Sequence, residues 1–184
     1  MLLQSHLPAP DAAERPAGPS PSRPAGPRLA VCGAHGGAGT TTLAALLDPA
    51  LDLGRVRPDA VAPALGLARM PGPLLLACRP TTWSAELAVA AVTALAGAGH
   101  EVAVLVIVSD GWPQTPVAAA RYRLLSARVG GVVRVPFVPA LRGCPDPSSV
   151  RLPRGARRAL ARILQFTAVP QARPVPEEVH HDVL

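Results

Sequence analysis

The sequence predicts an α/β fold: a doubly wound, mainly parallel sheet with helices on both of its faces. Four short, almost wholly apolar runs suit strands that are buried on both faces. They cover residues 29–33, 74–78, 102–108 and 132–138. A helical pattern follows each run, and such strand–helix alternation is typical of parallel sheets. These patterns leave the strand order open.

The predicted helices have local start and stop signals. They cover residues 40–47, 82–96, 116–129 and 154–166. The first follows a glycine-rich loop, and the second begins at Thr82 as its capping residue. The third has Thr115 as its cap, Pro116 in the first helical position and Gly130 just past its end.

Composition divides the chain into one folded domain and two tails. Residues 1–27 are rich in Pro, Ala, Gly and Ser and show no periodicity, which predicts a disordered arm. Residues 168–184 are predicted to be a second disordered tail. The folded domain is therefore expected over residues 28–167, close to the commonest domain size.

Charge and cysteine content limit the classes of function. The net charge is +6, and all basic residues other than histidine are arginines. That charge permits contact with nucleic acid or anionic lipid, but few aromatic residues are present to stack on bases. Three widely spaced cysteines without a CxxC pair indicate free, buried thiols in a reducing compartment. With no secretory or membrane-spanning pattern visible, we expect a cytoplasmic protein.

The stretch "CGAHGGAGTTTLAALL", residues 32–47, has the character of a phosphate-binding loop. A strand, a glycine-rich turn and a helix in succession form the context that such loops require. Gly36, Gly37 and Gly39 let the main chain approach a ligand, and Thr41 stands where a hydroxyl would bind Mg²⁺. The alternative is a tight strand-to-helix turn that holds no ligand.

The segment "HGGAGTTTLA" resembles the deviant Walker A motif of the ParA/MinD superfamily, K-G-G-x-G-K-T-T. It is most similar to a lysine-less branch that serves the polar localisation of pilus machinery. His35 takes the place of the signature lysine and Thr40 that of the phosphate-binding lysine. The resemblance implies a P-loop NTPase-like fold and ATP or ADP with Mg²⁺ as ligand, with Thr41 on the metal. The implied site comprises His35, Gly36, Gly37, Ala38, Gly39, Thr40, Thr41 and Thr42.

Other parts of the family pattern are missing, although a weaker likeness extends over residues 29–142. Residues 48–73 contain no hydrophobic strand ending in aspartate that would supply a Walker B acid. Their acids are Asp48, Asp52 and Asp59. Asp110 follows an apolar run, but a role as a loop cap explains it at least as well. Because phosphoryl transfer needs positioned cations and metal, efficient hydrolysis is not expected.

The last predicted helix has a basic face. Arg154, Arg158 and Arg162 recur every four residues, beside an apolar stripe made by Ala156, Leu160, Ile163 and Leu164. The favoured interpretation is an amphipathic helix packed on the sheet with a solvated basic face. The alternative is contact with DNA phosphates or an anionic membrane surface.

Three functions stay open from the sequence. The first is a degenerate ParA/MinD-like protein that binds nucleotide weakly or not at all and acts through a protein partner in positioning, partition or regulation. The second is an active ATPase in which an arginine, such as Arg79 or Arg142, replaces the missing lysine. The third is a ligand-free scaffold that docks a partner or DNA. No catalytic residue is assigned, and a homodimer is an open alternative to a monomer.

Overall fold

Five strands form one parallel sheet, which confirms the predicted fold class. The computed structural model describes residues 29–57 and 72–168, so both predicted tails lie outside these residues except for Ala168. The strand order is β2-β1-β3-β4-β5. The strands are β1 (Leu29–Gly33), β2 (Ala50–Arg55), β3 (Leu74–Cys78), β4 (Val102–Val108) and β5 (Val132–Val135).

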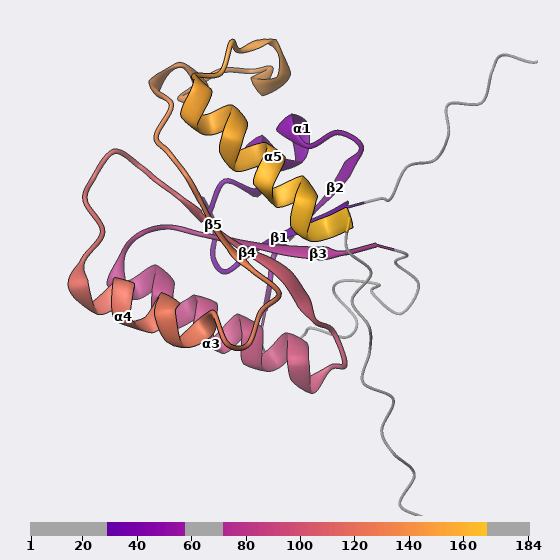
Figure 1. Ribbon diagram of the computed structural model, residues 1–184, viewed down its shortest axis with the longest axis vertical. Coiled ribbons are helices and arrows are strands. Elements are labelled where there is room, and N and C mark those ends of the chain that lie inside the picture. The colour runs from indigo at the N-terminus through magenta and orange to yellow at the C-terminus, as the bar shows by residue number, and fades with distance from the viewer. Residues whose placement is uncertain (1–28, 58–71, 169–184) are drawn as a thin grey trace, which may run out of the picture.

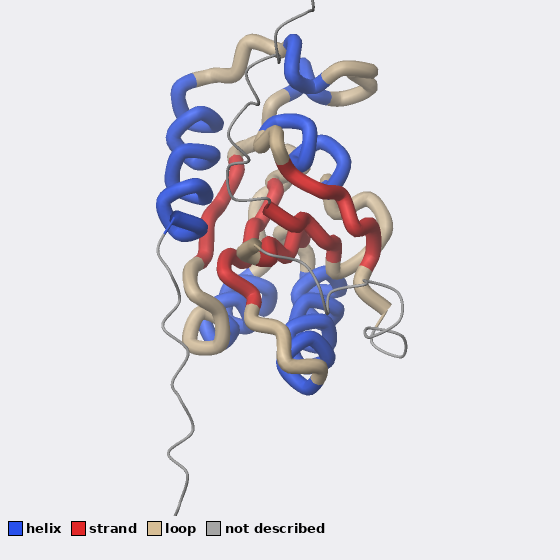
Figure 2. Tube along the Cα trace, turned by 90° about the vertical axis from the view of Figure 1, so that its right-hand side faces the viewer, coloured by secondary structure: helices blue, strands red, loops and turns tan. Residues whose placement is uncertain are grey.

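Helices cover both faces of the sheet (Figures 1 and 2). They are α1 (Thr40–Leu46), α3 (Thr82–Gly97), α4 (Pro116–Leu125) and α5 (Arg154–Ala168). In Figure 1, α1 and α5 lie on one side of the sheet and α3 and α4 on the other. From β1 the chain steps to β2 in one direction, and from β3 to β5 it steps in the opposite direction. Because parallel crossovers are right-handed, opposite steps place their helices on opposite faces.

The central strands are buried on both faces, as their uninterrupted apolar sequences predict. Every residue of β1 and β3 is buried. Alternate residues face two separate clusters, so that Cys32 packs towards α3 and α4 while Val31 packs towards α1 and α5. The sheet therefore holds the loops at its carboxyl edge on a rigid base.

Several predicted element boundaries need correction. The cap of α3 is Thr81, whose hydroxyl accepts a hydrogen bond from the Ser84 N–H, so the prediction of Thr82 is wrong by one residue. Thr115 caps α4 as predicted, but this helix ends at Leu125 and not at residue 129. The last strand ends at Val135 and not at residue 138, because a proline follows it and cannot donate to a sheet.

The β2 strand is absent from the sequence prediction. It pairs along β1 at one edge of the sheet, and all six of its residues are partly or fully exposed. An edge strand of this kind carries no continuous apolar run, which is why residues 50–55 gave no strand signal. In the described part of the chain, no helix has the length and apolar character needed to cross a membrane.

Candidate functional site

The glycine-rich loop lies where the sheet topology changes direction. Its strand, β1, has β2 on one side and β3 on the other. In doubly wound folds, ligands bind beyond the carboxyl ends of the strands at such a point. Two connections meet here, the loop over residues 34–39 and the turn over residues 79–81. The predicted phosphate loop therefore has the position that ligand sites take in this class of fold.

The backbone of the loop requires glycine at two positions. Gly37 has a φ of 77° and Gly39 a φ of 97°, both in the left-handed region that other residues rarely adopt. Gly36 and Gly37 are exposed, and a Cβ on either would meet no atom within 4 Å. Ala38 is buried beneath them. The outer side of the loop, at Gly36 and Gly37, is therefore accessible to a ligand, and the buried Ala38 side chain holds the loop on the protein.

The His35 side chain points into the protein and is only 6% exposed. Its Nδ1 lies 2.7 Å from the Gly36 carbonyl oxygen, and its Nε2 lies 2.8 Å from Ser84 Oγ. A neutral ring with its proton on Nδ1 satisfies both contacts, because the Ser84 hydroxyl donates to Nε2 while accepting from the Arg79 N–H. The Trp83 ring packs against the imidazole, with centroids 4.9 Å apart. His35 thus ties the loop to α3 and has no ring nitrogen left for a phosphate.

Arg79 brings a positive charge to the loop. It directly follows β3, and its Nε donates a hydrogen bond to the Gly37 carbonyl oxygen at 3.0 Å. The hydroxyl of Tyr122 donates to the Arg79 carbonyl oxygen and so fixes the backbone at this position. A guanidinium has five N–H donors, so its terminal nitrogens still offer donors to an anion placed at the loop. The sequence suggested Arg79 as a replacement for the missing lysine, but only the structure shows that its side chain reaches the glycine-rich loop.

Thr41 meets a carboxylate that the sequence did not assign to the site. Its hydroxyl donates to Asp52 Oδ2 at 2.6 Å, and Asp52 Oδ1 accepts a hydrogen bond from the Gly54 N–H at 2.8 Å. Both side chains are exposed. A hydroxyl beside a carboxylate is the oxygen chemistry with which proteins bind Mg²⁺ together with phosphate oxygens. Residues 50–55, "ALDLGR", contain neither a continuous apolar run nor a regular alternation, so no sequence signal placed Asp52 beside Thr41.

Thr40 and Thr42 lie on different sides of the loop base. The Thr40 Cγ2 would be 2.9 Å from a Cβ placed on Gly33, so the Thr40 side chain lies directly over that glycine. Thr42 instead lines a cavity together with Gly39. Of the eight predicted site residues, only His35 and Ala38 are buried. The three glycines and three threonines are exposed or half-buried.

The cavity beside the loop measures about 150 Å³. Its lining comes from the loop, α1 and the segments that follow β3, β4 and β5: Gly39, Thr42, Leu43, Leu46, Arg79, Val108, Ser109, Val135, Pro136, Phe137, Val138, Leu141 and Arg142. The Arg142 guanidinium lies 5.3 Å from the centroid of the Phe137 ring. Pockets that enclose drug-sized ligands measure roughly 300–1,000 Å³, so this cavity fits a fragment of a nucleotide and not a whole one.

Asp110 makes a structural contact beyond the carboxyl end of β4. Asp110 Oδ1 accepts a hydrogen bond from the Trp112 N–H at 3.1 Å, which is the loop-capping contact that the sequence suggested for it. Trp112 itself is 77% exposed. Within residues 29–57 and 72–168, no cluster of three or more His, Cys, Asp or Glu side chains is arranged to hold a metal ion.

The basic helix packs on the sheet as predicted, but the prediction that Leu164 belongs to its packed apolar stripe is wrong, because that residue is exposed. Ala156 and Ile163 of the predicted apolar stripe are buried, Leu160 is half-buried, and Leu164 is 47% exposed. The three predicted arginines, Arg154, Arg158 and Arg162, are all exposed.

Comparison of the sequence with protein-family models and with curated proteins finds no match.

Proposed function

We propose that this chain is a degenerate P-loop protein, similar to ParA/MinD proteins, that binds ATP or ADP with Mg²⁺ weakly and does not hydrolyse it above a background rate. Its role would be positioning, partition or regulation through a protein partner. The observation that carries the proposal is the contact between Thr41 and Asp52 beside the open glycine loop. That pair gives Mg²⁺ two oxygen ligands at the position where a bound nucleotide would supply phosphate oxygens.

We expect nucleotide binding to be weak because the loop has few positively charged groups that can reach a phosphate. Backbone N–H groups of the exposed glycines and the guanidinium of Arg79 can hold a phosphate. Thr40 adds no charge at the lysine position, and the ring nitrogens of His35 are used within the protein. Each missing charge-assisted hydrogen bond removes about 1.5–3 kcal/mol of binding free energy.

A Mg²⁺-dependent thermal shift tests the proposal. Mg-ATP and Mg-ADP should raise the melting temperature, and ATP with EDTA should raise it less, because Mg²⁺ then no longer joins the phosphate to the protein. At a ligand concentration ten times Kd the stabilisation is about 1.4 kcal/mol, which raises the melting temperature by roughly 3–6 °C. Asp52→Asn should abolish the difference between Mg²⁺ and EDTA.

Asp110→Asn is the matched control, because Asp110 is the other acid that the sequence suggested. It should leave the Mg²⁺ effect unchanged, since its carboxylate caps a turn. No thermal shift with any nucleotide would instead favour the ligand-free scaffold. If Asp110→Asn lost the Mg²⁺ effect and Asp52→Asn kept it, Asp110 and not Asp52 would be the acid that binds the metal, which would contradict the proposal.

Restoring the missing cation should strengthen nucleotide binding. Thr40→Lys is expected to lower the Kd for Mg-ADP by roughly ten- to a hundredfold, which corresponds to one charge-assisted hydrogen bond to phosphate. Ala90→Lys adds the same charge at an exposed position of α3 and should leave the Kd unchanged. Isothermal titration measures both, and equal affinities in the two variants would contradict a phosphate site in the loop.

The contact between Arg79 and Gly37 favours a second candidate, an active ATPase in which Arg79 replaces the lysine. The two candidate functions predict different rates of phosphate release from ATP. We expect release by the unmodified protein to equal that of Thr41→Ala. Turnover above that level, lost in Arg79→Gln, would establish the second candidate.

A further inference from the structure

The positive charge of this protein is concentrated in one segment. Residues 132–168 contain seven arginines and a single acid, Asp146, while acids and arginines balance over the rest of the chain. This segment includes β5, the last strand of the sheet, and α5, which packs beside it. An anionic partner is therefore attracted to this side of the molecule in particular.

In the part of the chain that the structure describes, the outer edge of β5 has backbone groups free for pairing. Among the described residues, β5 pairs only with β4. Leu105 N–H donates to the Gly131 carbonyl and Ser109 N–H to the Val135 carbonyl, so the odd-numbered residues face β4. Because successive residues of a strand alternate in direction, the N–H and C=O groups of Val132 and Arg134 point to the open edge. A further strand can pair there.

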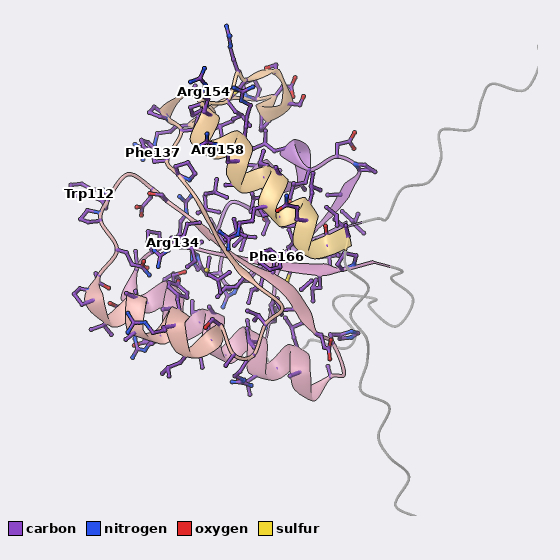
Figure 3. The ribbon with its side chains drawn as sticks, in the orientation of Figure 1. Trp112, Arg134, Phe137, Arg154, Arg158 and Phe166 are labelled. Carbon is purple, nitrogen blue, oxygen red and sulfur yellow. The ribbon has the colours of Figure 1, made fainter. Side chains whose placement is uncertain are left out.

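A basic groove runs along this open edge. It has a volume of about 400 Å³ and lies between β5 and one face of α5. Its lining is Val132, Val133, Arg134, Gly155, Arg158, Ala159 and Arg162. Gly155 and Ala159 leave room beside the strand, and Arg158 and Arg162 stand above it. Figure 3 shows Arg158 on α5 and Arg134 on the neighbouring strand β5.

Arginines flank the open edge from both faces of the sheet. Val133 belongs to the core beneath α1 and α5, so Arg134 points to the opposite face, where its guanidinium donates to the Gln114 side chain. Arg158 and Arg162 belong to the α5 face. A strand added beside β5 would thus have arginine near its side chains on both faces.

We propose that this groove binds an acidic protein segment in extended conformation, which pairs with β5 as a sixth strand. The backbone of the segment bonds to Val132 and Arg134, and its carboxylates bond to Arg158 and Arg162 on one face and Arg134 on the other. Binding by strand addition derives its affinity from the main chain and its specificity from the side chains. The proposal goes beyond the nucleotide site and does not depend on it.

The open edge favours a peptide over nucleic acid. Phosphates accept hydrogen bonds but do not donate, so a nucleic acid backbone would leave the outward carbonyl oxygens of Val132 and Arg134 without a donor. A strand offers both donors and acceptors. The arginines also disfavour pairing with a second copy of the same edge, because like charges would then face each other.

The test uses the fluorescein-labelled octapeptide Thr-Glu-Glu-Thr-Thr-Glu-Glu-Thr, which places two glutamates on each face of an extended strand. Fluorescence anisotropy with the full chain measures its binding. Arg158→Gln/Arg162→Gln should weaken binding about tenfold or more, because both side chains line the groove. Arg154→Gln/Arg157→Gln removes the same charge from exposed positions of the same helix outside the groove. This matched control should weaken binding less than about threefold, the effect of long-range charge alone.

A second probe separates strand pairing from charge. The same peptide with every backbone nitrogen methylated keeps its carboxylates and loses its N–H donors, so it should bind at least about tenfold more weakly. Equal binding of the methylated peptide, or equal losses in the two double variants, would overturn the proposal. Duplex DNA that binds while the peptide does not, with a steep salt dependence lost in Arg158→Gln/Arg162→Gln, would also overturn it and assign the groove to phosphate.

Discussion

Raising the pH from 9 to 11 is expected to lower the free energy of unfolding by about 5 kcal/mol. Burial raises the pKa of Cys32 and that of Cys78 from 9.0 to about 12. In the unfolded chain both thiols ionise near pH 9, whereas in the folded protein they stay protonated. Because the folded-state pKa is the higher one, the stabilisation is fully present below pH 9 and is lost as the pH rises towards 12, at about 1.4 kcal/mol per pH unit for each thiol.

This pH window contains few other titrating groups. The chain has no lysine, and its single tyrosine, Tyr122, has a pKa raised above its usual value by burial, which adds to the loss of stability above pH 10. Urea unfolding at several pH values measures the effect. Cys32→Ala/Cys78→Ala should start less stable at pH 8 and lose much less stability by pH 11. An equal loss in both proteins would show that the buried thiols do not cause it.

Ile163→Ala is expected to lower the free energy of unfolding by about 2–5 kcal/mol. Ile163 is fully buried in the core between α5 and the sheet. Its truncation removes apolar contacts and leaves a cavity that the rigid strands cannot close. Chemical unfolding monitored by circular dichroism measures the change.

Leu164→Ala is the matched control, in the next position of the same helix. Leu164 is 47% exposed, so its truncation should cost well under half as much as that of Ile163. The sequence placed both residues on one apolar stripe, and only burial separates them. Similar losses in the two variants would contradict the observed orientation of α5.

Local sequence signals were sufficient for most of the helices and for the buried strands. Thr115 and Pro116 start α4 because a cap acts on the neighbouring N–H groups, and these lie within the same few residues. The strands β1, β3 and β4 could be predicted without knowing which strands lie beside them, because a strand buried on both faces has a continuous apolar sequence. Local sequence did not predict where α4 ends. The Gly130 N–H bonds to the Val102 carbonyl, and this contact with the sheet draws the chain out of the helical direction.

The sequence by itself determined the parallel α/β fold, the glycine loop and the absence of lysine from it. The tertiary structure alone decided what surrounds that loop. Ser84 reaches His35 from 49 residues away, Arg79 reaches Gly37 from 42, and Asp52 reaches Thr41 from a strand with no apolar run. The physical reason is that hydrophobic patterning reports which faces are buried, whereas contacts between polar side chains depend on strand order. Only the pairing of β2 and β3 on either side of β1 brings these side chains together.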